Sequence, residues 1–145
     1  MSQPREVLDV DVLFVGGGPA GLAGALHLQH RIAEHNALCR EQGRPTLDEP
    51  MVAVIEKADA IGAHTISGAV MDPRGMDELI PDWREQSPPL TPVTSDELWF
   101  LTKGGKLTLP HPPWMKNTGF WTGSLNTLVR WLGGLVEAAG VNVFP

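Results

Sequence analysis

The residues best suited to chemistry form a glycine-rich turn near the start of the chain. Gly16-Gly17-Gly18-Pro19-Ala20-Gly21 fits the pattern Gly-x-Gly-x-x-Gly. In such a turn the first glycine permits a tight bend, the second lets the backbone approach a diphosphate with no Cβ in the way, and the third lets a helix pack closely. The N-terminus of that helix adds free N–H groups and a partial positive charge. The pattern therefore predicts a binding site for the diphosphate of a dinucleotide.

This glycine pattern is informative only when a strand precedes it and a helix follows it. Residues 8–15 (LDVDVLFV) are mostly β-branched and apolar, as in a buried parallel strand. From Pro19 to about Gln42, apolar residues recur at three- and four-residue spacing, which predicts a helix that ends before Gly43. Residues 51–56 (MVAVIE) have the character of a second strand. The sequence therefore predicts a βαβ unit around the glycine turn.

Glu56 ends the second predicted strand, where its carboxylate can accept hydrogen bonds from both hydroxyls of an adenosine ribose. Its charge would repel a 2′-phosphate and so disfavours NADP. The usual spacing from the first glycine is about 20 residues, and we assign the excess here to an insertion at 34–50 that extends the helix. A solvent-exposed Glu56 with no ligand is the alternative interpretation.

The segment that follows, EKADAIGAHTISGA at 56–69, combines glycines with small residues and suits close backbone contact with a cofactor. His64, Thr65 and Ser67 add hydrogen-bonding groups to it. For His64 taken alone, a structural or solvated role is the stronger interpretation. The segment favours a cofactor loop at the nucleotide end of the sheet.

Further elements are predicted by similar signals. They are a short helix at 73–80 with Asp72 as its N-cap, a surface loop at 81–96, a β-hairpin around Gly104 and Gly105, a helix from Ser124 to Gly140, and a strand at 141–144. The two hairpin glycines are expected to take positive φ angles in a tight turn.

The composition excludes several classes of protein. A net charge of −6 and a pI near 5.2 argue against nucleic-acid binding, which needs a surplus of basic residues. No apolar run approaches the roughly 20 residues of a membrane-spanning helix, and the first residues resemble neither a signal nor a transit peptide, so we expect a cytoplasmic chain. The single cysteine, Cys39, excludes an internal disulfide and any cluster ligated by this chain's cysteines alone.

Longer segments resemble a known family. DVLFVGGGPAGLAGALHL, VIEKADAIGAHTISGAVMDPRGMDELIPDW, PVTSDELWFLT and LVRWLGGLVEAAGVNVFP are similar to successive segments of electron transfer flavoprotein–ubiquinone oxidoreductases. The resemblance covers nearly all of the chain from about Asp9 onward. GAHTISGA followed by DPR and L-x-P-D-W is more specific than any glycine motif.

The resemblance implies a flavoenzyme at a membrane surface that takes electrons from reduced electron transfer flavoprotein and delivers them to ubiquinone. It implies one FAD and one [4Fe–4S] cluster, with the cluster ligands, most of the quinone site and the second half of the FAD site outside this chain. The implied location is peripheral, on the cytoplasmic face of a bacterial inner membrane or on the mitochondrial inner membrane.

The matching motifs also imply the cofactor contacts. The candidate FAD-binding residues are Gly16, Gly17, Gly18, Pro19, Ala20, Gly21, Glu56, Lys57, Gly62, Ala63, His64, Ser67 and Gly68. We assign no catalytic residue and no metal ligand, because the flavin itself performs electron transfer.

The expected fold class is α/β, a Rossmann-like FAD-binding βαβ unit of a two-dinucleotide-fold flavoprotein with a hairpin-containing insertion. We expect 1–145 to be the N-terminal part of an incomplete domain, divided into 8–72 (nucleotide unit and FAD loop), 73–123 (insertion) and 124–145 (helix and strand returning to the sheet). Two alternatives stay open: a FixC-like or geranylgeranyl-reductase-like flavoprotein, and a non-catalytic truncated fragment.

Aromatic residues gather late in the chain. Four of the five tryptophans lie between 98 and 131, along with Phe100, Met115 and Phe120. Such residues near Pro-rich loops can enter the headgroup region of a bilayer. The alternative is that they pack beneath the hairpin.

Overall fold

The computed structural model describes residues 7–145, which form two compact units. The first unit contains the chain as far as Thr65 together with Asn126–Pro145, and the second is Ile66–Leu125. Each unit is built on its own sheet or sheets. The first holds the sheet β1-β2-β8, and the second holds the sheet β3-β7-β4 and the hairpin β5-β6.

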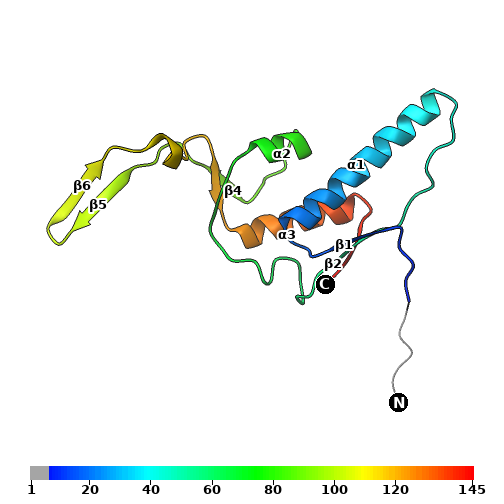
Figure 1. The fold of residues 1–145 in the computed structure, drawn as a ribbon, viewed down its shortest axis with the longest axis horizontal. Coiled ribbons are helices and arrows are strands. Elements are labelled where there is room, and N and C mark those ends of the chain that lie inside the picture. Colours follow the sequence, from blue (N-terminus) through cyan, green and yellow to red (C-terminus); the bar gives the residue numbers. More distant parts are fainter. Residues whose placement is uncertain (1–6) are drawn as a thin grey trace, which may run out of the picture. The chain divides into compact units, whose positions relative to one another are not determined.

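The first unit is a parallel βαβ unit with one further strand (Figure 1). Strands β1 (Val12–Val15), β2 (Val52–Ile55) and β8 (Asn142–Phe144) pair in that order, and helices α1 (Pro19–Glu41) and α3 (Leu125–Ala138) lie on the same side of them. The predicted βαβ order and the predicted last strand are therefore confirmed. β1 and β2 are each shorter than predicted, since the apolar runs at 8–15 and 51–56 are longer than the strands that form within them.

The helices cover one face of this sheet. Val52 and Val54 are fully buried on that face, and Gly24 brings α1 close to Phe14, since a Cβ on residue 24 would lie 2.9 Å from the Phe14 ring. On the other face, Leu13 and Val15 are 47% and 79% exposed. The expectation that the first strand is buried is therefore correct for one face only, because both helices lie on the same side.

The 34–50 insertion extends α1 and then returns along it. Gly43 has a φ of +63°, and the Arg44 N–H donates to the Cys39 carbonyl at 2.8 Å, which ends the helix near the predicted position. The return segment is tethered by Asn36, a buried side chain that donates to the Leu47 carbonyl at 3.2 Å and accepts from the Leu47 N–H at 2.8 Å. Asn36 therefore satisfies both backbone groups of Leu47.

The second unit contains an antiparallel sheet in which β7 lies between β3 and β4. Its elements are β3 (Ala69–Met71), α2 (Arg74–Leu79), β4 (Leu90–Pro92), β5 (Leu98–Thr102), β6 (Gly105–Leu109), η1 (Pro113–Met115) and β7 (Trp121–Gly123). The prediction that Asp72 is the N-cap of α2 is wrong by one residue, because the N-cap is Pro73, although Asp72 accepts the Arg74 N–H at 3.1 Å. The prediction that 81–96 is only a loop is wrong, because β4 pairs with a strand about 30 residues later, a partner that local composition does not reveal.

Trp83 forms the core of this second unit. Its side chain is fully buried, and its ring meets the Trp121 ring edge-on at a centroid distance of 4.8 Å. The indole N–H donates to the Asp77 Oδ1 at 2.8 Å. The buried tryptophan thus keeps its one polar group paired, and it links α2 to β7.

The predicted hairpin is confirmed as β5 and β6, joined through Lys103 and Gly104. Neither Gly104 nor Gly105 has a positive φ, so the turn chemistry predicted for them is wrong. A two-residue turn can also close with negative φ angles at both central positions, which any residue adopts. The Thr102 hydroxyl supports the turn by donating to the Gly105 carbonyl at 3.1 Å.

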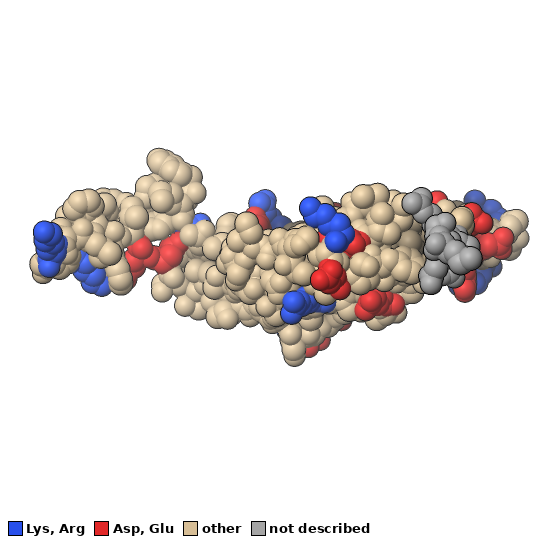
Figure 2. All heavy atoms as spheres, turned by 90° about the horizontal axis from the view of Figure 1, so that it is seen from below, with Lys and Arg blue, Asp and Glu red and all other residues tan. Residues whose placement is uncertain are grey.

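Charged side chains of both signs are interspersed on the face of the molecule drawn in Figure 2. None of the helices in the described part of the chain combines the length and apolar character needed to cross a bilayer.

Replacing Asn36 with Ala should release the return segment. The change removes two part-buried hydrogen bonds to the N–H and carbonyl of Leu47, each worth about 0.5–1.5 kcal/mol. We expect a lower unfolding temperature in the full-length protein and faster proteolysis within 43–50. Glu41→Ala, at an exposed site on the same helix, is the control, and equal proteolysis of both variants would contradict the tether.

Candidate functional site

The glycine turn joins β1 to α1 through a close backbone contact. Gly16 has a φ of +106°, and its N–H still donates to the Ile55 carbonyl at 2.8 Å, so the turn begins while the chain is bonded to β2. A Cβ on residue 21 would lie 2.1 Å from the Gly16 carbonyl oxygen. Glycine is therefore needed at 16 for conformation and at 21 for space.

Gly18 is the N-cap of α1 and has no neighbour within 4 Å of where a Cβ would stand. The Leu22 N–H makes a bond of the first helical turn to the Gly18 carbonyl at 3.0 Å, and N–H groups before it have no helical acceptor. No side chain caps this helix end, and its first turn carries no acidic residue. The turn therefore offers free donors and open space to an anion.

Glu56 turns toward the glycine turn. Its Oε2 accepts the Gly17 N–H at 2.8 Å, and its Oε1 accepts the Ala58 N–H at 3.0 Å. The N–H groups of Ala58 and Gly17 hold the pKa of this carboxyl below its ordinary value. Each carboxylate oxygen can accept a further hydrogen bond, so an ionised acceptor stands beside the turn.

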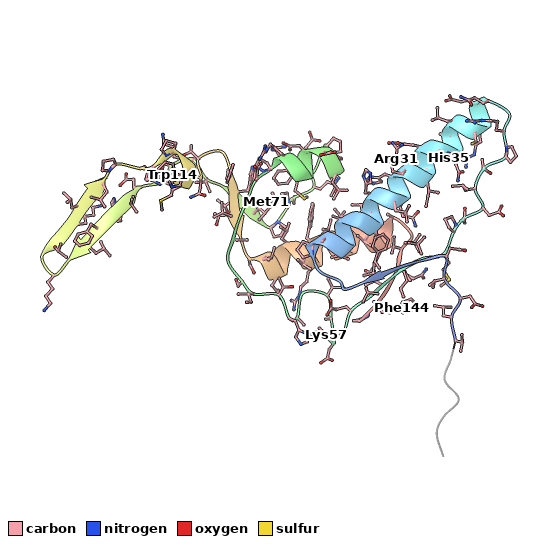
Figure 3. All side chains as sticks on the ribbon, in the orientation of Figure 1. Arg31, His35, Lys57, Met71, Trp114 and Phe144 are labelled. Carbon is pink, nitrogen blue, oxygen red and sulfur yellow. The ribbon has the colours of Figure 1, made fainter. Side chains whose placement is uncertain are left out.

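A cavity of about 310 Å³ opens at the carboxyl ends of β1 and β2. Its lining residues are Val15, Gly16, Ile55, Glu56 and Lys57. Figure 3 shows Lys57 in the connection that follows β2. Open α/β sheets bind ligands at this end of their strands.

The predicted cofactor loop starts within the first unit. Gly62 has a φ of +81°, and its carbonyl accepts both the Thr65 N–H at 3.0 Å and the Asn126 side-chain amide. Ala63 and His64 are exposed, and the charge of His64 is a minor contributor to the lowered pKa of Glu56. The first unit therefore brings the loop from Glu56 to His64 alongside the glycine turn.

The remaining two predicted site residues belong to the second unit. There the Ser67 hydroxyl donates to the Ser124 hydroxyl at 3.2 Å, and Gly68 has a φ of +87°.

Two residues near the turn were missed by sequence reasoning. Ile61 packs against Gly17, and Asn126 on α3 binds the Gly62 carbonyl. Ile61 is the one large apolar side chain in KADAIGAHT, a signal for packing that could have been used. Asn126 lies 64 positions beyond Gly62 and has no signal in the local pattern.

No family model matches this chain. Comparison with individual known proteins does identify relatives. The rice mitochondrial electron transfer flavoprotein-ubiquinone oxidoreductase is 42% identical over 146 aligned positions, which cover 100% of this chain and 23% of that protein. The pig enzyme of the same name is 43% identical over 148 positions, covering 100% and 22%. A probable electron transfer flavoprotein-ubiquinone oxidoreductase from Acinetobacter baylyi is 40% identical over 97% of this chain and 24% of its own length.

This chain is related in sequence to the electron transfer flavoprotein–ubiquinone oxidoreductases. The resemblance predicted from its motifs is confirmed. The chain spans less than a quarter of the length of these relatives, from 22% to 24%.

Two solved structures confirm the fold class predicted for this chain. The flavin-dependent monooxygenase PieE, in complex with FAD and substrate, matches with a TM-score of 0.56 at 19% identity, over 94% of this chain and 23% of its own. PqsL from P. aeruginosa, in complex with 2-aminobenzoylacetate, matches with a TM-score of 0.51 at 19% identity, over 93% and 33%. These matches support a Rossmann-like α/β fold.

Glu56→Gln should reduce the acid sensitivity of the fold. Because the folded pKa of Glu56 is lowered, its carboxylate stabilises the protein above the unfolded pKa, and that stabilisation is lost as pH falls through the folded pKa. Unfolding temperatures of the full-length protein, measured from about pH 7 to about pH 3, should fall less steeply for the variant. Glu41→Gln is the control, and parallel curves for Glu56→Gln and the wild type would contradict the role of Glu56.

Proposed function

We propose that this chain is the FAD-binding amino-terminal part of an oxidoreductase that passes electrons from reduced electron transfer flavoprotein to ubiquinone. The proposal is supported by similarity along the whole chain to proteins named for that reaction. The same similarity favours it over a FixC-like or geranylgeranyl-reductase-like flavoprotein.

The observation that carries the FAD proposal is the open space at Gly18. A diphosphate needs backbone donors that it can approach closely, and Gly18 has nothing within 4 Å of its missing Cβ at the N-terminus of α1. Carboxylate oxygens of Glu56 stand beside the same turn, where they suit ribose hydroxyls. The residues present therefore fit an adenine dinucleotide.

FAD, when bound, supplies the acceptance and release of electrons. The chain's own residues have binding and orienting roles. The backbone N–H groups of Gly18, Ala20 and Gly21 would hold the diphosphate, Glu56 would hold the ribose, and the Gly62 to His64 loop would complete the contacts made by the first unit.

The [4Fe–4S] cluster of the proposed enzyme would be ligated outside this chain. Among residues 7–145 there is no group of three or more His, Cys, Asp or Glu side chains that could hold a metal ion. Cys39, the single cysteine, is buried on α1 beside His35.

We also propose that the hairpin β5-β6 and η1, in the second unit, contact a membrane surface. Trp99 and Phe100 on β5 are 45% and 59% exposed, and Trp114 in η1 is 84% exposed. Trp114 is labelled in Figure 3. Exposed aromatics of this kind favour the interface of a bilayer over water. The location proposed is peripheral, on the cytoplasmic face of a bacterial inner membrane or on the mitochondrial inner membrane, and similarity to mitochondrial and bacterial relatives supports it.

Polar contacts keep the two parts of this surface together. The Asp96 carboxylate, just before β5, accepts the Asn117 N–H at 2.6 Å, just after η1. That N–H is the main cause of the lowered pKa of Asp96. The alternative, that the aromatics pack internally, applies to Trp121, which meets Trp83.

Gly18→Ala tests the FAD proposal. The φ of −82° at Gly18 is open to alanine, and the added methyl has no protein neighbour, so the unfolding temperature of the apoprotein should not change. The methyl does obstruct an approaching diphosphate, so FAD affinity should fall by about tenfold or more, as for a loss of about 1.4 kcal/mol. The measurement is flavin fluorescence on titration of the full-length apoprotein.

The control for Gly18→Ala is Gly75→Ala, which adds a methyl to open space on α2. Gly43→Ala is not a suitable control, because Gly43 has a positive φ that alanine rarely adopts. Equal FAD affinity of Gly18→Ala and Gly75→Ala would contradict the proposed site.

Trp114→Ser tests the membrane proposal. Loss of the exposed indole should weaken binding of the full-length protein to phosphatidylcholine–phosphatidylglycerol vesicles by about tenfold, because burial of a large apolar side chain contributes about 1.5–3 kcal/mol. Leu38→Ser removes an apolar side chain that is 52% exposed on α1 and serves as the control. Equal vesicle binding of the two variants, by cosedimentation, would contradict this surface.

A further inference from the structure

Ile61 lies between two glycines that come from different elements. A Cβ on residue 17, in the glycine turn, would stand 2.4 Å from the Ile61 Cδ1. A Cβ on residue 133, in α3, would stand 3.2 Å from the Ile61 Cγ2. The side chain of Ile61 therefore fills the space from the glycine turn to α3, and glycine at both positions makes room for it.

A second contact ties the same loop to α3. The Asn126 amide donates to the Gly62 carbonyl, and a Cβ on residue 62 would lie 3.0 Å from the Asn126 carbonyl oxygen. Gly62 also has a φ of +81°, which side chains rarely adopt. The first turn of α3 therefore holds the backbone of the loop closely.

The other end of the loop is tied to the glycine turn. Glu56 accepts N–H groups from both Gly17 and Ala58, at 2.8 and 3.0 Å. The connection from Glu56 to Gly62 is thus braced on one side by the glycine turn and on the other by α3. Interactions of this kind fix a binding site before the ligand arrives and so reduce the cost of ordering it.

We propose that Ile61 and Asn126 are positioning residues, through which α3 holds the cofactor loop and the glycine turn in their binding arrangement. Neither residue is placed in contact with the cofactor. The inference rests on the proposed FAD site, and it adds that α3, about 110 residues after the glycine turn, sets the affinity of that site.

Gly133 and Gly134 offer a matched pair of variants. Both lie in α3, and Ala at either position removes a helix-interior glycine. The methyl of Gly134→Ala meets nothing within 4 Å, whereas the methyl of Gly133→Ala meets Ile61 and requires a shift of a few tenths of an ångström. Gly134→Ala should bind FAD as the wild type does. Gly133→Ala should bind about tenfold more weakly, a typical coupling between residues in contact.

A double variant distinguishes positioning from general damage to α3. Ile61→Val retains Cγ2, which meets α3, and lacks Cδ1, which meets Gly17. Because Cδ1 makes the contact with the glycine turn, Ile61→Val should itself weaken FAD binding. Gly133→Ala should then cost less FAD affinity when added to Ile61→Val than it costs alone, since both changes act through the Ile61 side chain, whereas general damage to α3 would cost the same in both cases. Asn126→Asp, which cannot donate to the Gly62 carbonyl, should weaken FAD binding independently of residue 133.

The experiment measures FAD affinity and FAD dissociation rate in the full-length protein for the wild type and these variants. If the wild type and Gly134→Ala both fail to bind FAD, the proposed function is wrong. If both bind it and Gly133→Ala binds equally well, or Gly133→Ala costs the same FAD affinity with and without Ile61→Val, the positioning role is overturned.

Discussion

A contact between two backbone segments organises the first unit. The α-carbon of Gly21 lies so close to the Gly16 carbonyl that a single methyl on residue 21 would stand 2.1 Å from that oxygen. This approach sets the start of α1 directly against the end of β1. This contact positions the N–H donors of the helix and the open space at Gly18. The carboxylate of Glu56, which follows β2, is held beside the same turn by the Gly17 N–H.

Local patterns predicted the elements of this unit well. The apolar spacing of α1 and α3, the glycine stops and the short β-branched strands each reflect the geometry of one element. The end of α1 lies within one residue of the prediction. The hairpin was also predicted, although its turn conformation was not, since two glycines permit several turn types.

Contacts between distant segments could not be predicted in this way. Three such contacts depend on which segments meet in the fold, and no local periodicity in the sequence encodes that. They are the pairing of β4 with β7, the packing of Ile61 against Gly17, and the hydrogen bond from Asn126 to Gly62. The uncovered face of the parallel sheet is another case. Apolar residues such as Leu13 and Phe144 line an open cavity of about 640 Å³ on that face, although parallel sheets are normally covered on both faces.

The central claim is that backbone N–H groups at the start of α1 hold the diphosphate of FAD. A crystal structure of the full-length protein with FAD bound measures this directly. The account predicts phosphate oxygens within hydrogen-bonding distance, about 2.7–3.2 Å, of N–H groups in the segment 18–21. A diphosphate bound elsewhere, with this helix terminus facing only solvent, would contradict it.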